Sequence, residues 1–507
     1  MPMKGGIIML EINNLTIKIN ERYIIKDLNL ILNKKDKLAI IGEEGNGKST
    51  LLKCILGICN YAEISGIINL KGNKIGYLKQ SLSDEDLNLK VYDYLFIDEN
   101  DYYNKINNFY KYLNVINLKD DILNQKLSTL SGGEKVKVSI LKLLLEENDI
   151  LFLDEPTNDL DIETLNWLEG FINNTDKPIM YVSHDETLLS NTANMILHIE
   201  QIKKKQECKH TLLKIDYDTY VSDRIRMIDK QTSVARNEKR EFDKKEEKLR
   251  RIMEKVDHQQ ATISRSNPHG AKLLKKKMHT LKSQEKKLDE TELTEVPDVE
   301  ESINLYFEKV NIPTNKVILD LNLDELKVEN KVLSKNIKLN IIGNPHICII
   351  GKNGVGKSTL IKLIYNELKD RDDIKVGYMP QNYEDILEKY DNVLDFIVQS
   401  GKKEDITHAR MLLGNIKFTK EEMTGKLKDL SNGSKAKLFL IKLELDKCDI
   451  LILDEPTRNV SPLSNPVIRD VLKNYTGCII SISHDRKYIN EVVDTLYELT
   501  ENGLIRR

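Results

Sequence analysis

Short apolar or strand-like runs recur along the chain and predict buried strands. Each is about five residues long, which is typical of parallel strands covered on both faces. Two runs precede glycine-rich loops, two end in paired carboxylates, two precede Ser-His-Asp and two end in glutamine. In chain order they lie at 37–41, 76–80, 150–154 and 178–182, and again at 346–350, 377–381, 450–454 and 478–482. The pattern predicts an α/β fold with parallel sheets.

The middle of the chain has a different periodicity. Apolar or small side chains recur there about every 3.5 residues, the spacing of a helix that packs against another helix. The upstream set is Val221, Ile225, Ile228, Thr232, Ala235, Phe242, Leu249, Met253 and Val256, and the downstream set is Leu274, Met278, Leu281 and Leu288. A proline and a glycine within 267–270 separate the two sets. We therefore expect an antiparallel helical hairpin, whose first helix would be about 50 Å long if unbroken from 221 to 256.

Four motifs occur twice, in the same order. GEEGNGKST at 42–50 matches GKNGVGKST at 351–359, and the segments that begin at 127, 150 and 183 match those that begin at 427, 450 and 483. Two collinear sets of this kind do not arise by chance, so the chain contains two copies of one domain. The predicted boundaries are 9–202 for the first copy, 203–302 for a linker with its tip near 258–272, and 303–507 for the second copy.

Length and composition set limits on the class of protein. The 507 residues are 40% hydrophobic and 31% charged, enough for two or three domains and polar enough for a soluble protein. No run approaches the roughly 18 apolar residues of a membrane span, and the start has no signal-peptide pattern, so we expect a cytoplasmic protein. The six cysteines are scattered without zinc spacing and are expected to be reduced and mostly buried.

The glycine-rich motifs have the spacing of phosphate-binding loops. Their glycines let successive backbone N–H groups face phosphates at a helix N-terminus. Lys48 and Lys357 are expected to pair with the β and γ phosphates of ATP, and Ser49 and Ser358 to offer hydroxyls to Mg²⁺. The complete candidate loops are Gly42, Glu43, Glu44, Gly45, Asn46, Gly47, Lys48, Ser49 and Thr50, and Gly351, Lys352, Asn353, Gly354, Val355, Gly356, Lys357, Ser358 and Thr359.

Two carboxylates end one apolar run in each copy. Asp154 and Asp454 are placed to hold Mg²⁺, and Glu155 and Glu455 to accept the proton of an attacking water. Further candidates are assigned by their place in the repeat: His184 and His484 as sensors of the γ phosphate, Gln80 and Gln381 as ligands of water or Mg²⁺, and Tyr23 as a platform for adenine, where the second copy has Val332.

These motifs resemble those of the ATP-binding cassette superfamily over about 9–200 and 303–507. The resemblance implies two cassette (P-loop NTPase) domains joined by the long α-helical hairpin, two Mg·ATP per chain and ATP hydrolysis. It also implies that LSGGE caps the ATP held by the opposite cassette, through Ser131, Gly132 and Gly133 in the first copy and Ser431 and Gly433 in the second. The second signature reads LSNGS. The site at Lys48 would therefore face a degenerate signature, and we expect the two sites to hydrolyse ATP at different rates.

The predicted linker is basic within a chain of net charge −3. It has 25 lysines and arginines against 15 acidic residues from 203 to 290, and eight against one from 258 to 288. Such a concentration around a hairpin end favours contact with an RNA backbone. The candidate tip residues are Thr262, Ile263, Ser264, Arg265, Ser266, Asn267, Lys272, Lys275, Lys276 and Lys277. None is aromatic, so we expect any effect on tRNA or on a drug to be indirect.

Tandem cassettes with a basic hairpin and no membrane domain resemble the ABC-F ATPases. That resemblance implies binding at the tRNA exit site of the bacterial 70S ribosome, contact with rRNA and P-site tRNA, and a linker that acts near the peptidyl-transferase centre. The long linker, and a first cassette with no long insertion between Gln80 and Ser131, are similar to the antibiotic-resistance branch. The drugs implied are lincosamides, pleuromutilins and streptogramin A compounds.

Three other hypotheses stay open. The chain could be a housekeeping translation factor of the same type, the ATPase subunit of a membrane exporter, or a DNA-repair ATPase. The basic hairpin disfavours the exporter, and the lack of zinc cysteines and of a very long coiled coil disfavours the DNA enzyme. We expect no membrane or DNA partner, and a monomer whose two cassettes pair with each other.

Overall fold

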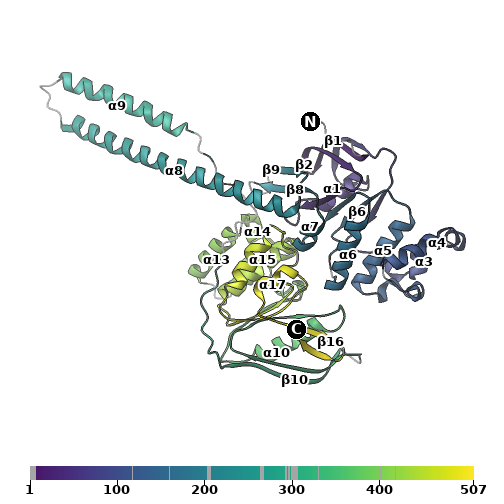
Figure 1. Cartoon of the computed structure of the whole chain (residues 1–507). Coiled ribbons are helices and arrows are strands. Elements are labelled where there is room, and N and C mark those ends of the chain that lie inside the picture. The colour runs from purple at the N-terminus through teal and green to yellow at the C-terminus, as the bar shows by residue number, and fades with distance from the viewer. Residues whose placement is uncertain are drawn as a thin grey trace. The chain divides into compact units, whose positions relative to one another are not determined.

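The computed structural model describes residues 7–96, 98–116, 118–158, 160–202, 207–262, 268–291, 294, 297, 306–328, 331–398, 402–416 and 418–507. They form two compact units (Figure 1). The first unit, Met1–Tyr217 with Glu300–Arg507, holds both copies of the repeat, here called cassette 1 and cassette 2. The second unit, Asp218–Val299, is the hairpin.

Cassette 1 is built on a six-stranded sheet in the order β5-β6-β7-β3-β8-β9. Its strands are β3 (Lys37–Ile41), β5 (Ile75–Leu78), β6 (Ile150–Asp154), β7 (Ile179–Val182), β8 (Met195–Ile202) and β9 (Glu207–Leu213). A second, antiparallel sheet consists of β2 (Arg22–Asn33), β1 (Ile8–Ile19) and β4 (Glu63–Asn69). All residues of β3, β6 and β7 are buried, as their apolar runs predict.

Cassette 2 repeats this plan in the order β13-β14-β15-β12-β16-β17. The strands are β12 (His346–Ile350), β13 (Val376–Met379), β14 (Ile450–Asp454), β15 (Cys478–Ile482), β16 (Thr495–Thr500) and β17 (Gly503–Arg506), with β10 (Val317–Val328) and β11 (Lys331–Ile342) in a separate hairpin. The central strands pair in parallel in both cassettes, and only the last strand of each sheet is antiparallel. The motif residues at the carboxyl ends of these strands therefore gather at one edge of each sheet.

Helices complete both cassettes. Cassette 1 has α1 (Lys48–Ile55), α2 (Asp84–Asn88), α3 (Val91–Leu95), α4 (Glu99–Ile116), α5 (Gly132–Leu145), α6 (Ile162–Asn174), α7 (Glu186–Thr192) and the 3₁₀ turns η1 (Asp120–Asn124) and η2 (Leu127–Thr129). Cassette 2 has α10 (Lys357–Leu368), α11 (Glu384–Leu387), α12 (Val393–Ile397), α13 (Lys403–Asn415), α14 (Lys420–Thr424), η3 (Leu427–Asp429), α15 (Asn432–Leu445), α16 (Asn465–Lys473) and α17 (Arg486–Val492).

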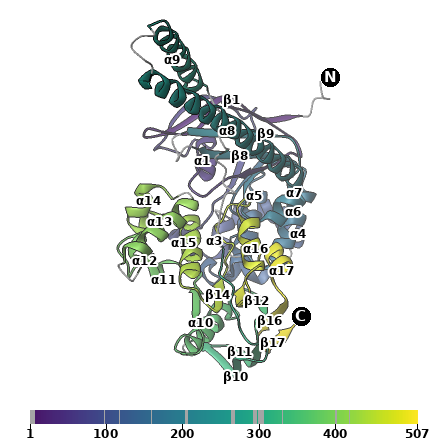
Figure 2. The ribbon, with the colours of Figure 1, turned by 90° about the vertical axis from the view of Figure 1, so that its left-hand side faces the viewer.

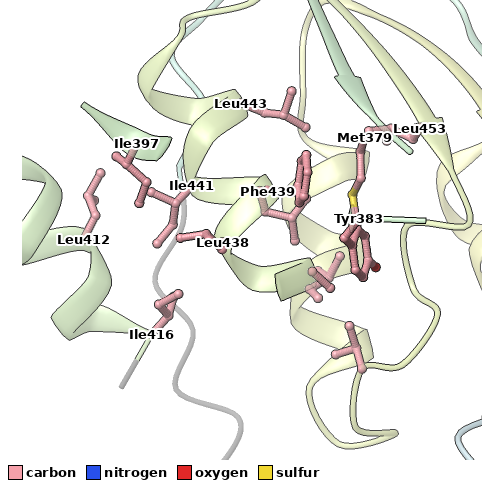
Figure 3. Close-up of a cluster of buried hydrophobic side chains, with 14 of the residues drawn as sticks. Met379, Tyr383, Ile397, Leu412, Ile416, Leu438, Phe439, Ile441, Leu443 and Leu453 are labelled. Atoms are coloured by element: carbon pink, nitrogen blue, oxygen red, sulfur yellow. The ribbon is translucent and has the colours of Figure 1, made fainter. Parts of the chain in front are cut away.

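The signature helix of cassette 2 is fixed by an apolar core. Figure 3 shows Leu438, Phe439 and Ile441 of α15 among side chains from the neighbouring helices and strands. The Phe439 ring stacks on Tyr383, with centroids 5.3 Å apart. Because this face of α15 is held by close packing, the position of its N-terminus, where the degenerate signature lies, is set by the core.

The hairpin consists of α8 (Tyr217–Thr262) and α9 (Pro268–Asp289), which lie side by side and antiparallel in Figures 1 and 2. The 46 residues of α8 would span about 70 Å at 1.5 Å per residue, more than the sequence predicted. The predicted seam is confirmed: all its members except Ile225 are half-buried or buried, and Ala235, Val256 and Leu281 are buried.

Two predicted boundaries are displaced. Strand β9 pairs with β8 across the expected end of cassette 1 at 202, so the sheet continues to Leu213 and the linker begins later than predicted. Pro268 is the first residue of α9 rather than part of the turn. Proline is well accommodated at the first position of a helix, because its missing N–H has no intrahelical partner there.

Candidate active sites

Each phosphate-binding loop joins a buried strand to a helix. The loop after β3 enters α1 at Lys48, and the loop after β12 enters α10 at Lys357. Gly47, which caps α1, has φ +90°, and a Cβ there would lie 2.2 Å from the Ile24 Cγ2 atom. Glycine is thus required at this position, because other residues rarely adopt this φ and because a side chain would clash with Ile24.

The loop lysines take equivalent positions in the two cassettes. Lys48 Nζ donates to the carbonyl oxygens of Gly42 and Glu43 at 2.6 and 2.9 Å. Lys357 Nζ donates to those of Gly351 and Lys352 at 2.8 and 3.0 Å. Both ammonium groups therefore lie within their own loops, next to the backbone N–H groups that begin the helix, an arrangement suited to binding phosphate.

The strand-end aspartate lies beside the loop serine in cassette 1. Ser49 Oγ donates to Asp154 Oδ1 at 2.7 Å, and the Tyr77 hydroxyl donates to Oδ2 at 2.8 Å. Burial raises the pKa of Asp154 against the effect of these two hydrogen bonds. A hydroxyl and a buried carboxylate fit a Mg²⁺ ion that phosphates and water would also ligate. Ser358 and Asp454 line the same kind of cavity in cassette 2.

Glu155 is held by several polar side chains. Gln80 Nε2 and Asn158 Nδ2 each donate to Oε2 at 2.7 Å, and His184 Nε2 lies 3.7 Å from Oε1. Burial favours a high pKa for this carboxyl, but the nearby His184 ring and the hydrogen bond from Asn158 outweigh it and lower the pKa to about 2. Glu155 is therefore an ionised, oriented acceptor at neutral pH.

Glu455 occupies the same backbone position in a different environment. Both glutamates adopt a left-handed conformation, with φ +50° at Glu155 and +57° at Glu455. The backbone N–H of His484 donates to Glu455 Oε2 at 3.2 Å. Arg458 replaces the asparagine that binds Glu155 in cassette 1. Burial and the neighbouring Asp454 raise the pKa of Glu455 to about 8. The two candidate bases thus differ in protonation at pH 7.

The two histidines also differ. His184 Nδ1 lies 2.8 Å from the carbonyl oxygen of Val460, which belongs to the other cassette. His484 Nε2 is 3.9 Å from Glu455 Oε1. Burial and the ammonium group of Lys357 lower the pKa of His484 to about 4, so this histidine is neutral at pH 7. A neutral imidazole can donate a hydrogen bond to phosphate from one nitrogen.

The cavity at Lys357 is built by both cassettes and has a volume of about 470 Å³. Cassette 2 contributes its loop, Gln381, Asp454, Glu455 and His484, and cassette 1 contributes Gly132, Thr157, Asn158, Leu160, His184 and Asp185. The intact signature of cassette 1 therefore lies opposite the phosphate loop of cassette 2. Neither cassette alone would enclose this site.

The cavity at Lys48 has a volume of about 750 Å³ and is lined by cassette 1 residues, including Ser49, Thr50, Gln80 and Glu155. Here the loop itself contacts the opposite signature: Glu44 Oε2 accepts from the Gly433 backbone N–H at 2.5 Å, and Glu43 Oε1 accepts from Lys437 Nζ at 2.5 Å. A carboxylate thus lies at the N-terminus of α15, which is a favourable position for an anion.

Tyr23 does not join the cavity at Lys48. Its neighbours Arg22 and Ile24 line the cavity, whereas the Tyr23 ring is 42% exposed and lies 5.9 Å from the ammonium groups of both Lys18 and Lys26. Successive side chains of a strand point to opposite faces, so Tyr23 faces away from Arg22 and Ile24. Leu333, rather than Val332, likewise lines the cavity of cassette 2.

The remaining signature residues begin α5 and α15. Ser131 and Ser431 each accept a hydrogen bond from the backbone three residues later, which caps the helix, and Glu134 completes a capping box in cassette 1. Gly133 packs against Thr164, and a Cβ there would lie 2.6 Å from its hydroxyl. The loop residues Gly45, Asn46, Asn353, Gly354, Val355, Gly356 and Thr359 lie in or beside the two cavities, and Asn46 Nδ2 donates to the Ile199 carbonyl at 3.0 Å.

Some site residues were not predicted. Arg22 donates to the Gly45 carbonyl at 3.2 Å and to Gln201 at 3.2 Å. Asn158 and Arg458 change the surroundings of the two glutamates. Asn158 and Arg458 are the first of four consecutive positions, NDLD against RNVS, at which the two motifs differ, and that difference was the available signal.

At the linker tip, Ile263, Ser264, Arg265, Ser266 and Asn267 lie outside the described residues. Thr262 ends α8, and its hydroxyl donates to the His258 carbonyl at 2.9 Å. The lysines of α9 are all exposed: Lys272, Lys275, Lys276, Lys277, Lys282, Lys286 and Lys287. The hairpin therefore presents a dense row of positive charge.

The fold and the two cavities define a P-loop ATPase built from tandem cassettes. The family described as ABC transporter matches residues 25–158 and 334–458, about half of the chain, and the chain belongs to this family. It binds ATP through cassettes that hydrolyse it, and such cassettes generally use Mg²⁺. Within the described part of the chain, no helix has both the length and the apolar character to cross a membrane.

Several known proteins are similar over nearly the whole chain. ATP-binding protein Uup of Buchnera aphidicola (subspecies Schizaphis graminum) is 28% identical over 98% of this chain and 82% of its own length. ABC transporter F family member 5 of Arabidopsis thaliana is 26% identical over 95% and 73%. The archaeal ribosome recycling factor aABCE1, solved in complex with the stalk protein aP1, superposes with a TM-score of 0.59 at 18% identity, covering 97% of this chain and 89% of that one. This last likeness concerns the fold.

Proposed function

We propose that this chain is an ATP-driven, ribosome-binding protein of the ABC-F type. In this proposal each cavity takes one Mg·ATP. Lys48 and Lys357 bind phosphate, and Ser49 with Asp154 and Ser358 with Asp454 hold the ion. Glu155 activates water, and Glu455 does so in its ionised form. The observation that carries the ribosome part is the row of seven exposed lysines on α9, because such a row binds a phosphate backbone through charge.

The proposed binding site is the tRNA exit site of the bacterial 70S ribosome, which would make the protein cytosolic. The hairpin would reach toward the peptidyl-transferase centre beside P-site tRNA and contact rRNA. Similarity over 95% of the chain to a protein named as an F family member supports this assignment. Protection against lincosamides, pleuromutilins or streptogramin A compounds is the finer part of the proposal.

Sedimentation with ribosomes tests the binding step. Glu155→Gln with Glu455→Gln should bind ATP without rapid hydrolysis, so this variant should pellet with 70S ribosomes only when ATP is present and should be released by salt. Adding Lys275→Ala, Lys276→Ala and Lys277→Ala should abolish pelleting. The control removes three exposed lysines of α8 that lie among acidic residues, Lys244→Ala, Lys245→Ala and Lys248→Ala, and should retain most of it. An unchanged pellet with the α9 variant would contradict the proposed role of the hairpin.

A translation assay separates resistance from a housekeeping role. Added protein should raise the lincomycin concentration that halves protein synthesis, and the α9 variant should not. Ribosome binding without any change in drug sensitivity would favour the housekeeping hypothesis. Association with a membrane protein instead of ribosomes would favour the exporter.

A further inference from the structure

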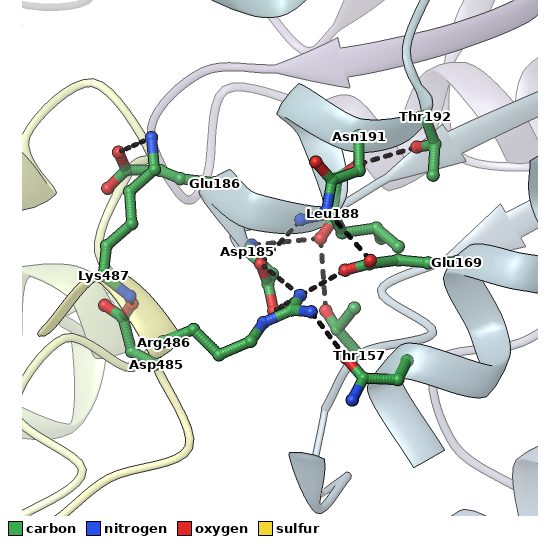
Figure 4. Close-up of polar contacts among 12 residues, drawn as sticks. Thr157, Glu169, Asp185, Glu186, Leu188, Asn191, Thr192, Asp485, Arg486 and Lys487 are labelled. Atoms are coloured by element: carbon green, nitrogen blue, oxygen red, sulfur yellow. Dashed lines mark hydrogen bonds and ion pairs between the residues drawn. The ribbon is translucent and has the colours of Figure 1, made fainter. Parts of the chain in front are cut away.

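Two charge pairs join the cassettes through residues that do not themselves line either ATP cavity. Arg469 of α16 in cassette 2 forms a bidentate pair with Glu186 of α7 in cassette 1, and its second hydrogen bond is 3.2 Å long. Arg486 of α17 pairs with Glu169 of α6 and donates to Asn166 Oδ1 at 2.9 Å. Both pairs are largely shielded from water, since the four side chains are 4–16% exposed. Figure 4 shows Arg486 directed toward Glu169 and Asp185.

The two pairs are related by the internal repeat. From the signature onward, equivalent residues of the two cassettes differ by 300 in number, as Asp154 and Asp454 do. Glu169 is therefore equivalent to Arg469, and Glu186 to Arg486. Each pair joins position 169, or its equivalent 469, in one cassette to position 186, or its equivalent 486, in the other. Cassette 1 carries an acid at both positions, and cassette 2 carries an arginine at both.

The side chains that support these charges differ in the same sense. Asn191 Nδ2 donates to Glu169 Oε2 at 2.9 Å. The equivalent residue, Glu491, accepts from Arg469 Nε at 2.8 Å. An amide donor thus stands beside the acid, and a carboxylate acceptor beside the arginine. The two cassettes therefore differ at all three equivalent positions in the same sense. A single exposed ion pair would not require the third position to differ as well.

We infer that these residues form a pairing seam (positions 169, 186 and 191 of cassette 1 with 469, 486 and 491 of cassette 2) that directs each cassette 1 to a cassette 2. Two cassettes 1 brought together in the same way would oppose Glu169 to Glu186 twice, and two cassettes 2 would oppose arginines. Like charges at largely buried positions are strongly unfavourable. Covalent connection then favours the partner within the same chain.

Neighbouring charges either follow the same pattern or contribute little. Asp185 and Asp485 are equivalent and identical, and Asp185 lies 3.5 Å from Arg486, an attraction that a glutamate at position 486 would turn into repulsion. Lys487 Nζ, 3.3 Å from Glu186 Oε2, adds to the basic side of cassette 2. Lys352 and Glu163 also pair across the cassettes at 3.6 Å, but both are at least 73% exposed, where an ion pair contributes little.

The test divides the seam between two chains. Variant A carries Glu169→Arg, Glu186→Arg and Asn191→Glu, so both of its cassettes are basic. Variant B carries Arg469→Glu, Arg486→Glu and Glu491→Asn, so both of its cassettes are acidic. Each alone should remain monomeric and lose at least about tenfold in ATPase rate, because the cavity at Lys357 needs residues of both cassettes. The control, Glu163→Arg, should retain the wild-type rate.

Mixing the two variants distinguishes failed pairing from failed folding. An equimolar mixture should form a complex with one copy of each chain, measured by light scattering, and recover ATPase activity. A single chain with all six substitutions should again be an active monomer. Wild-type activity in variant A alone, or no complex and no recovery on mixing, would overturn the inference. No ribosome takes part in these assays, so their failure would leave the proposed function untouched.

Discussion

The opposite environments of Glu155 and Glu455 predict opposite effects of the same substitution on stability. Folding raises the pKa of Glu455 from 4.5 to about 8. Below pH 4.5 this carboxyl is protonated in both the folded and the unfolded chain, and it does not reduce the free energy of unfolding. As the pH rises from 4.5 toward 8, the unfolded chain ionises first and the free energy of unfolding falls. One pKa unit corresponds to about 1.4 kcal/mol, so the carboxyl costs about 3 kcal/mol at pH 7 relative to a group that stays neutral.

Glu455→Gln removes this cost. Relative to wild type, the free energy of unfolding of the nucleotide-free variant should increase, and the gap should widen by about 2 kcal/mol between pH 6 and pH 8. Urea unfolding followed by circular dichroism, with a chelator present, measures it. Glu155→Gln is the matched control. Folding lowers the pKa of Glu155 from 4.5 to about 2, so its contribution is present above pH 4.5 and lost as the pH falls toward 2. This variant should lose about 3 kcal/mol at pH 7.

The reasoning would be refuted if the difference in free energy of unfolding between Glu455→Gln and wild type stayed constant from pH 6 to pH 8. Equal shifts of the same sign in both variants would also refute it, because the argument depends on the different neighbours of two residues with the same backbone conformation.

Three more predictions concern cassette 1. Glu44→Gln removes the negative charge that accepts from Gly433 at the N-terminus of α15, where it would compete with the phosphates of ATP. The ATP concentration for half-maximal hydrolysis should therefore fall about three- to tenfold. An increase would show that the carboxylate assists ATP binding instead. Asn158→Ala removes a hydrogen bond to Glu155, and the acidic limb of the pH–rate profile should move to higher pH; an unmoved limb would exclude Glu155 as the titrating base. Gly47→Ala, at φ +90°, should abolish binding of a fluorescent ATP analogue to cassette 1, and retained binding would contradict the steric argument.

Much of the fold could be predicted because apolar runs and repeats are local. The runs at 37–41 and 346–350 coincide with β3 and β12. The hairpin seam was visible in its 3.5-residue spacing, but its length was not, because polar residues continue a helix without marking its end. The face of the strand on which Tyr23 lies could not be predicted from its distance to the phosphate loop, because one residue along a strand moves a side chain to the other face.

The contacts between cassettes could not be predicted, because no spacing shows which surfaces meet. The phosphate-loop glutamates were predicted to bind nucleotide, yet their side chains contact Gly433 and Lys437. The different protonation of Glu155 and Glu455 depends on burial and on single neighbours. The change of charge between Glu169 and Arg469 was present in the repeat, but its meaning required the structure.

The most direct test of the ribosome proposal places a photocrosslinker on the hairpin. Lys276→p-benzoylphenylalanine, in the background of Glu155→Gln and Glu455→Gln, would be bound to 70S ribosomes with ATP and irradiated. We predict ATP-dependent crosslinks to large-subunit rRNA near the peptidyl-transferase centre. Crosslinks confined to other regions of the ribosome, or none beyond those formed without ATP, would contradict the account.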